Sequence, residues 1–131
     1  MPLDHVGVAV ARIADALALW EPVLGVRAGP VEEVPSQKVR VAFLDASGTH
    51  IELLEPTDPE SAVGRFLAAR GPGLHHVAFA VPSVDAALAT AAERGQRLID
   101  RVGRPGARGR RVGFVHPASM AGTLVEFVEG P

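Results

Sequence analysis

The sequence predicts an α+β fold built from two tandem modules, each with the order β-α-β-β-β, in a single domain. An internal repeat is the first reason: LDHVGVAV begins at Leu3, and LHHVAFAV begins 71 residues later at Leu74. The match continues downstream, where RVAFLD matches RVGFVH and GTHIEL matches GTLVEF. Size is the second reason, because 131 residues that are 47% hydrophobic suffice for one packed core.

Each module begins with a strand, because apolar residues alternate along its first segment. The bulky Val and Phe residues fall on one face of that strand, and small residues with His5 or His76 fall on the other. One sheet with one helix cannot bury both of its faces. We therefore expect the eight strands to form one curled mixed sheet, with the bulky faces under the helices and the histidine faces lining a cleft.

A helix is predicted after the first strand of each module, over 13–20 and 84–94. In the second module Ser83 is a good N-cap and Gly95 a good C-terminal stop. In the first module Pro22 is expected to end or kink the helix early, because proline lacks the backbone N–H that a helix interior needs.

The segment between the modules, PTDPESAVGRFLAARGPG, reads as a linker helix. We expect Asp58 to cap it, Pro59 to occupy its first position and Gly71 to stop it. The predicted organisation is a single domain of residues 1–131. The first module occupies 1–57, the linker helix 58–72 and the second module 73–131.

Three further strands complete each module, since each copy contains three extended apolar runs bounded by turn residues. Three extra residues in the second copy fit in the turn HPASMAG before its last strand. The strands are expected near 26–34, 39–44 and 51–55 in the first module, and near 97–102, 111–115 and 123–128 in the second.

Charge and composition exclude several classes of protein. A net charge of −2 and a pI near 6.2 give no general attraction to nucleic acid or to an anionic membrane. The chain has no cysteine, so disulfides and Cys-based metal sites are impossible. The N-terminal residues do not resemble a signal peptide, and no apolar run approaches the ~20 residues of a membrane-spanning helix. A cytoplasmic location is therefore expected.

The repeat singles out two histidines and two glutamates as candidate metal ligands. His76 is the copy of His5, whereas His75 aligns with an aspartate. Glu52 and Glu126 occupy matching positions in the last strand of each module, and each is flanked by apolar residues that point the other way. Each module therefore presents one imidazole and one carboxylate on the face opposite its bulky residues.

Two imidazoles and two carboxylates suit a six-coordinate divalent first-row ion. Four protein ligands leave two positions for water or substrate oxygens, and such an ion can polarise a carbonyl and hold a developing enolate. The alternative is that duplication copied residues with a purely structural role. Recurrence at matched positions favours the metal site, because an unpaired buried carboxylate is costly.

The one basic run, RVGRPGARGRR, contains five arginines. Its glycines and proline favour a flexible loop. A solvated loop is one interpretation, and a cradle for phosphate groups of a large anionic substrate is the other. The run has no interleaved aromatic residues and does not match a nucleotide-binding fingerprint, so a nucleic-acid role is weakly supported.

Paired modules that each supply a His and a Glu resemble the vicinal-oxygen-chelate superfamily, also called the glyoxalase fold. Within it the chain resembles the methylmalonyl-CoA epimerase family, through IELLEPT, GLHHVAF, RLID and FVHPASMAGTLVE. The segments that carry the resemblance span nearly the whole chain. In combination these four motifs are more specific than the metal ligands alone.

The resemblance implies that His5, Glu52, His76 and Glu126 bind one divalent ion, with cobalt first and nickel, manganese or zinc as alternatives. It implies interconversion of (R)- and (S)-methylmalonyl-CoA, in which the α-proton is removed on one face, the ion stabilises the enolate, and a proton returns on the other face. The implied partners are the acyl-CoA substrate and a second copy of the chain in a homodimer.

Epimerisation needs acid–base groups on both sides of the substrate. Glu126 is the candidate for one of them. One form of the family has a glutamate on the third strand, where this chain has Val41. The second group is therefore open between Lys38, an ordered water and Glu52, with Glu52 or the water favoured. The predicted substrate-binding residues are Lys38, Arg104, Arg108, Arg110 and His116.

Two other functions within the same fold stay open. Glyoxalase I uses the same His/Glu/His/Glu ligand set and acts on a glutathione hemithioacetal. Some relatives sequester antibiotics without a metal, which the four ligand-type residues count against. Extradiol dioxygenases fit poorly, because they use three ligands and are usually longer.

Overall fold

The computed structural model describes residues 1–130, which divide into two compact units. The N-terminal unit comprises His5–His75. The C-terminal unit comprises Met1–Asp4 together with the chain from His76 onward. The first four residues of the chain therefore belong to the unit formed by the second repeat.

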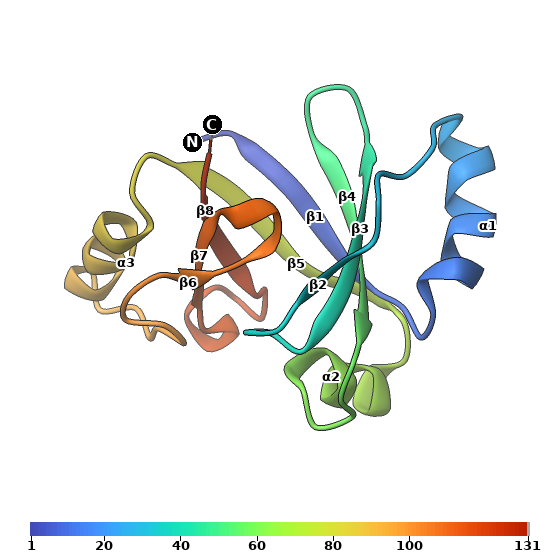
Figure 1. The fold of residues 1–131 in the computed structure, drawn as a ribbon. Coiled ribbons are helices and arrows are strands. Elements are labelled where there is room, and N and C mark those ends of the chain that lie inside the picture. The colour runs from blue at the N-terminus through green and yellow to red at the C-terminus, as the bar shows by residue number, and fades with distance from the viewer. Residues whose placement is uncertain (131) are drawn as a thin grey trace. The chain divides into compact units, whose positions relative to one another are not determined.

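Four strands of the N-terminal unit lie in the order β2-β3-β4-β1. β1 pairs with β4 in parallel, and the other neighbours are antiparallel. Helix α1 packs on β3 and β4, and α2 contacts β4 (Figure 1). The elements are β1 (Leu3–Ala9), α1 (Ile13–Leu24), β2 (Glu32–Val34), β3 (Val39–Asp45), β4 (His50–Pro56) and α2 (Ala62–Arg70).

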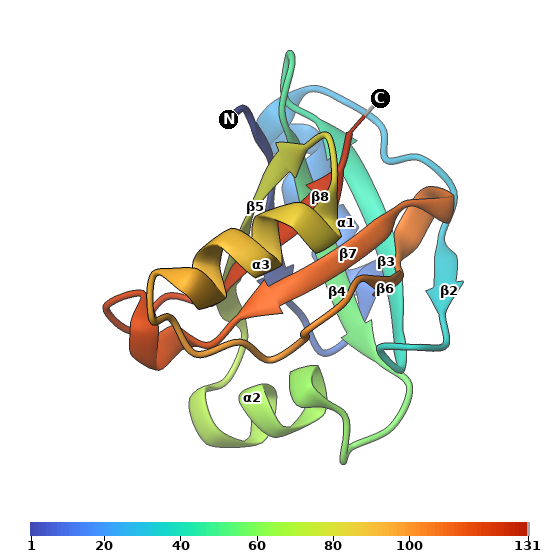
Figure 2. The ribbon, with the colours of Figure 1, turned by 90° about the vertical axis from the view of Figure 1, so that its left-hand side faces the viewer.

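The C-terminal unit repeats this plan in the strand order β5-β8-β7-β6, again with its first and last strands parallel. Helix α3 packs across β7 and β8 (Figure 2). The start of the chain lies beside β5, where the Ala80 N–H donates to the Pro2 carbonyl over 2.9 Å. The elements are β5 (Gly73–Val81), α3 (Val84–Glu93), β6 (Arg104–Pro105), β7 (Arg111–Val115) and β8 (Val125–Glu129).

Each unit contains a four-stranded mixed sheet with helices, which confirms the predicted α+β class and the repeated β-α-β-β-β order. Within residues 1–130 no helix is long and apolar enough to cross a membrane.

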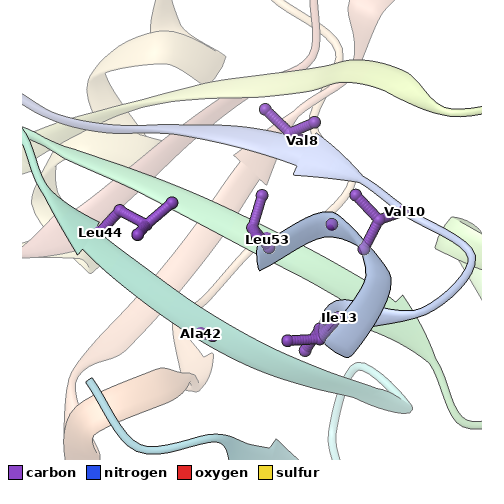
Figure 3. Packing of buried hydrophobic residues seen from close by; sticks show 7 residues of the cluster. Val8, Val10, Ile13, Ala42, Leu44 and Leu53 are labelled. Atoms are coloured by element: carbon purple, nitrogen blue, oxygen red, sulfur yellow. The ribbon is translucent and has the colours of Figure 1, made fainter. Parts of the chain in front are cut away.

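The bulky faces of the strands pack under the helices, as the alternation predicts. In the N-terminal unit Val8 of β1, Val10 just after this strand, Leu44 of β3 and Leu53 of β4 belong to one buried cluster with Ile13 at the start of α1 (Figure 3). Burial of a side chain of this size contributes roughly 1.5–3 kcal/mol.

In the C-terminal unit Val84 and Leu88 of α3 are fully buried against the sheet. A glycine makes this approach possible, because a Cβ at Gly113 of β7 would lie 2.7 Å from Leu88 Cδ1. The helix therefore sits closer to β7 than any larger residue would allow.

Of the two effects predicted for Pro22, the early end of the first helix was wrong. Helix α1 continues to Leu24 and ends at Gly25, whose φ of 70° is left-handed and whose N–H donates to the Glu21 carbonyl. Pro22 lies in the last turn, where the missing N–H costs one hydrogen bond and the helix ends soon afterwards.

The linker helix starts later than predicted. Ser61 is its N-cap, accepting from the Gly64 N–H over 3.0 Å. Asp58 instead accepts from the Glu60 N–H in the preceding turn, so its carboxylate is already engaged there. The predicted ends at Gly71 and the predicted N-cap of α3 at Ser83 are confirmed.

Two predicted strands are mostly irregular. Over 26–34 only Glu32–Val34 forms a strand, since Pro30 interrupts the pairing that precedes it. Over 97–102 only Leu98 makes a bridge, and the strand β6 follows at Arg104–Pro105. Within 97–102 the Asp100 side chain accepts a hydrogen bond from the Phe114 N–H over 2.9 Å, in place of a backbone carbonyl of a paired strand.

Candidate functional site

The N-terminal unit contains one buried histidine–glutamate pair. His5 Nε2 lies 3.2 Å from Glu52 Oε1, and the residues are 3% and 6% exposed. The parallel register of β1 and β4 sets Gly7 opposite Glu52. His5 is two residues before Gly7, so both side chains stand on the same face of the sheet.

The C-terminal unit contains the same pair. His76 Nε2 lies 2.9 Å from Glu126 Oε1, and each residue is 4% exposed. Ala78 stands opposite Glu126 in the parallel register of β5 and β8. In both units the residue opposite the glutamate is small, which leaves room above the strand for a carboxylate and an imidazole.

An aromatic ring packs against each imidazole from the strand that pairs with the strand of the glutamate. Phe43 stands directly opposite Glu52, and Phe114 directly opposite Glu126. Each phenyl ring meets its histidine ring edge to face, at 5.8 Å between centroids and interplanar angles of 86° for His5 and 85° for His76. The second repeat has therefore kept the geometry of the pair as well as its residues.

The chemistry of each pair fits a metal ion. Two adjacent ligand atoms that each bind an ion at about 2.1 Å are about 3 Å apart when they subtend a right angle. Both His–Glu separations match this value. A buried carboxylate is costly unless a positive charge or hydrogen bonds compensate it, and a divalent cation supplies that charge.

A second repeated contact, which was not seen in the sequence patterns used above, lies on the face of each sheet opposite the His–Glu pair. The Ile13 N–H donates to Glu55 Oε1 over 2.8 Å, and the Val84 N–H donates to Glu129 Oε2 over 3.0 Å. Each glutamate follows its ligand-type glutamate by three residues, so it points to the helix side of the sheet. Each also satisfies a free N–H at a helix start, where a negative charge is favourable.

An arginine completes this contact in both modules. Arg40 Nη1 lies 2.9 Å from Glu55, and Arg111 Nε lies 3.8 Å from Glu129. The recurrence of two glutamates and one arginine at matched positions was the sequence signal for it. These contacts attach the helix to the last strand of each module, which carries the ligand-type glutamate.

Among the predicted substrate-binding residues, Arg104 contacts an aromatic ring that borders a His–Glu pair. Its guanidinium carbon sits 5.5 Å from the centroid of the Phe114 ring, which in turn contacts His76. Arg104 Nε is 3.1 Å from an oxygen of Asp100. The stacked arginine is thus held at the ring that borders the C-terminal pair.

Arg110 and Arg108 both face Asp4. Arg110 donates to the two Asp4 carboxylate oxygens over 2.9 and 3.3 Å, and its Nε donates to the Glu129 carbonyl over 2.6 Å. Arg108 Nη2 is 3.7 Å from Asp4 Oδ2. These arginines line a hollow of ≈ 580 Å³ with Gly109, Arg111, Glu129 and Gly130.

Asp85 anchors the loop before β6. Its Oδ1 accepts from the Gly103 N–H over 2.7 Å and from Arg111 over 2.8 Å. The Gly103 hydrogen bond, followed by the Arg111 contact, holds the pKa of Asp85 below its ordinary value.

Lys38 is not brought to the N-terminal pair. Its neighbour Val39 stands opposite Pro56, four residues further along β4 than Glu52, which is about 13 Å. Lys38 Nζ instead lies 3.5 Å from Asp58 in an exposed pair. The Glu60 N–H, with a smaller contribution from Lys38, keeps the pKa of Asp58 below its ordinary value.

His116 and His75 each make contacts outside the His–Glu pairs. His116 follows β7, two residues after Phe114, and its Nδ1 accepts the Ala118 N–H over 3.0 Å at the start of a short 3₁₀ helix. His75 meets the Phe66 ring edge to face at 5.0 Å. This contact joins β5 to helix α2 and differs from the His–Glu arrangement of His76.

Residues 4–114 match the family model of the Glyoxalase/Bleomycin resistance protein/Dioxygenase superfamily. The chain belongs to this superfamily. A protein of Bacillus subtilis (strain 168) without an assigned activity is 42% identical over 127 residues, which cover 97% of this chain and 91% of that protein. The superfamily membership of the chain agrees with the resemblance stated from the sequence motifs.

Several relatives with a named activity are epimerases. Ethylmalonyl-CoA/methylmalonyl-CoA epimerase of Cereibacter sphaeroides is 36% identical over 128 residues, covering 95% of this chain and 94% of that enzyme. A variant of Streptomyces coelicolor methylmalonyl-CoA epimerase, solved in complex with 2-nitronate-propionyl-CoA, is 34% identical with a TM-score of 0.92. That match covers 100% of this chain and 99% of the other.

Proposed function

We propose that this superfamily member is a metal-dependent epimerase that interconverts (R)- and (S)-methylmalonyl-CoA. The observation that carries the proposal is the buried His–Glu pair that recurs with the same geometry in both modules. Support for the substrate comes from relatives named methylmalonyl-CoA epimerase that are about 35% identical to this chain, several of which are solved with a CoA ligand.

We propose that the two pairs together hold one divalent ion. The residues His5, Glu52, His76 and Glu126 are all buried and are of the types that could hold it. When bound, such an ion would polarise the thioester carbonyl of the substrate and so make the neighbouring C–H easier to ionise. Cobalt is our first candidate, with nickel, manganese or zinc as alternatives, since mixed N/O ligands accept all four.

The protein's own part in the reaction is to move a proton. We propose that a Glu126 carboxylate oxygen exchanges the α-proton on one face of the substrate. Its burial beside His76 and Phe114 keeps water away from the carboxylate and holds its position. Glu52 is the sequence-based candidate for the exchange on the other face.

The CoA portion requires cationic contacts. The hollow lined by Arg108, Arg110 and Arg111 supports a role in binding phosphate, although a phosphate must there compete with Asp4 and Glu129. Arg104, held on the Phe114 ring, is better placed for the malonyl carboxylate. Lys38 and His116 remain predicted substrate contacts. The cytoplasmic location and the homodimer also remain predictions.

Deuterium exchange tests the proposed function directly. Purified protein incubated with methylmalonyl-CoA in D2O should exchange the α-hydrogen and should convert either epimer into the mixture. The proposal fails if no exchange occurs while a glutathione hemithioacetal is consumed, since that result identifies a glyoxalase I. It also fails if neither substrate reacts in protein loaded with a divalent ion.

A further inference from the structure

One face of the N-terminal unit, which we call its histidine face, carries His5 and Glu52. Strand register extends this face outward across β3 and β2. Phe43 stands opposite Glu52, and Val41, two residues before Phe43, stands opposite Glu32. Residues directly opposite one another in an antiparallel pair share a face. Glu32 therefore stands on the histidine face.

The neighbouring residue on β2 serves as an internal comparison. Glu33 stands opposite Arg40, on the face that packs against α1 in the middle of β3. Glu33 is exposed, whereas Glu32 is half-buried. Two consecutive glutamates on one short strand are thus placed on opposite sides of the sheet, and only Glu32 shares a side with the ligand-type residues.

The spacing suits a small acyl group. Glu32 lies two strands away from Glu52 and two residues along, which places their Cα atoms about 12 Å apart. Val41 and Phe43 stand on the same face of β3 between them, so a small acyl group bound there would lie over apolar side chains. Glu32 is also exposed enough to exchange a proton with water, whereas Glu52 is 6% exposed.

The two modules differ at this position, although they agree at the His–Glu pair. Val41 of β3 corresponds to Val112 of β7 in the repeat, and the residue opposite Val112 is Arg104. The first module therefore places a carboxylate where the second places a guanidinium. A substrate with an acidic C–H and a carboxylate needs this asymmetry, because one end must lose a proton and the other must be bound by a cation.

We propose that Glu32 is the second acid–base group of the epimerase, acting on the substrate face opposite Glu126. The inference rests on the proposed function. In one direction a Glu32 carboxylate oxygen takes the α-proton, and the C–H electron pair remains on the substrate, delocalised into the thioester carbonyl. Protonated Glu126 then gives its proton to the other face of the same carbon. No oxidation occurs, and proton exchange with water resets both carboxyl groups.

Single epimers in D2O distinguish a base from a structural residue. Wild-type protein should exchange the α-hydrogen of either epimer and invert both. Glu32→Gln should slow inversion at least 100-fold, the scale of a lost general base. It should still exchange the hydrogen of the one epimer that Glu126 deprotonates. Glu33→Gln is the matched control and should behave as wild type.

Three results would overturn the assignment of Glu32. Glu32→Gln could invert both epimers at the wild-type rate, or it could lose exchange from both epimers equally while keeping its metal content and its fold. If Glu32→Gln does not fold, Glu32→Asp replaces it, and an Asp variant with inversion no faster than a folded Glu32→Ala variant counts against the assignment. Failure of wild-type protein to exchange either epimer would instead refute the proposed function.

Discussion

Arg110 binds Asp4 through both carboxylate oxygens, and Asp4 is the residue immediately before His5. The two side chains are 16% and 12% exposed, so the pair is largely shielded from solvent. The same guanidinium donates to the Glu129 carbonyl at the end of β8. Arg110 thus fixes the backbone on the N-terminal side of a proposed metal ligand.

A double-mutant cycle on this pair should show strong coupling. Asp4→Ala and Arg110→Ala should each destabilise the protein, and the two effects should overlap by about 1–3 kcal/mol, because removing either partner breaks the same two hydrogen bonds. Urea unfolding measures the four stabilities. Arg101→Ala, an exposed arginine of the same loop, is the control. Additive effects would show that the pair contributes nothing to stability.

The two adjacent histidines should differ in their effect on metal binding. His76→Ala should reduce the bound divalent ion to a small fraction of the wild-type content, because it removes a proposed ligand. His75→Ala should retain the ion, because His75 packs on Phe66 instead. Metal analysis of the purified proteins measures this. The reverse pattern would mean that the repeat had been aligned one residue out of register.

The glutamates that bind helix N-termini should contribute to stability and not to chemistry. Glu55→Ala should lower the free energy of unfolding by about 1–2 kcal/mol, because it leaves the Ile13 N–H without its acceptor. Glu55→Gln keeps an acceptor oxygen and should lose less. Urea unfolding with the exposed Glu33→Gln as control measures both. Equal losses in the Ala and Gln variants would show that charge alone matters.

Stability at acid pH should depend on Asp85. Its pKa is lower in the folded protein than its ordinary value of 3.8, so the unfolded chain binds the proton more readily. The contribution of Asp85 is therefore fully present above about pH 4 and is lost as pH falls through the folded pKa. Asp85→Asn should flatten the fall in stability in that range and speed hydrogen exchange at the Gly103 amide. An unchanged acid profile would contradict this assignment.

The arginines that line the hollow should contribute only to binding of the CoA portion of the substrate. Arg108→Ala should raise the KM for methylmalonyl-CoA by about tenfold, equivalent to roughly 1.4 kcal/mol of lost binding. The KM for the corresponding pantetheine thioester, which lacks the nucleotide phosphates, should not change. An equal increase for both thioesters, or none for either, would make the loop a structural element.

The repeat made most of the fold predictable, because periodicity two and periodicity 3.6 recur at matched positions in both copies. The elements that were wrong share a cause. Pro22 and Asp58 were interpreted from residue type, whereas their effect depends on which backbone group each one meets. Only the folded chain shows that Asp100 accepts the Phe114 N–H and so shortens the strand pairing.

The His–Glu pairs could be predicted from the sequence because each lies in a short alternating strand segment that recurs in the second module. Glu32 was not, because its position on the histidine face depends on the β2–β3 register. That register follows from a turn of four residues, 35–38, in which Lys38 adopts a left-handed φ of 55°. A shift of one residue would have placed Glu33 on that face instead.

Metal stoichiometry tests the central proposal, a single ion shared by both modules. Titration of metal-free protein with cobalt should show one ion per chain, and replacing Glu52 or Glu126 by Ala should weaken that one site in either case. Two ions per chain, of which Glu52→Ala removes one and Glu126→Ala removes the other, would contradict the shared site and would leave each His–Glu pair as an independent centre.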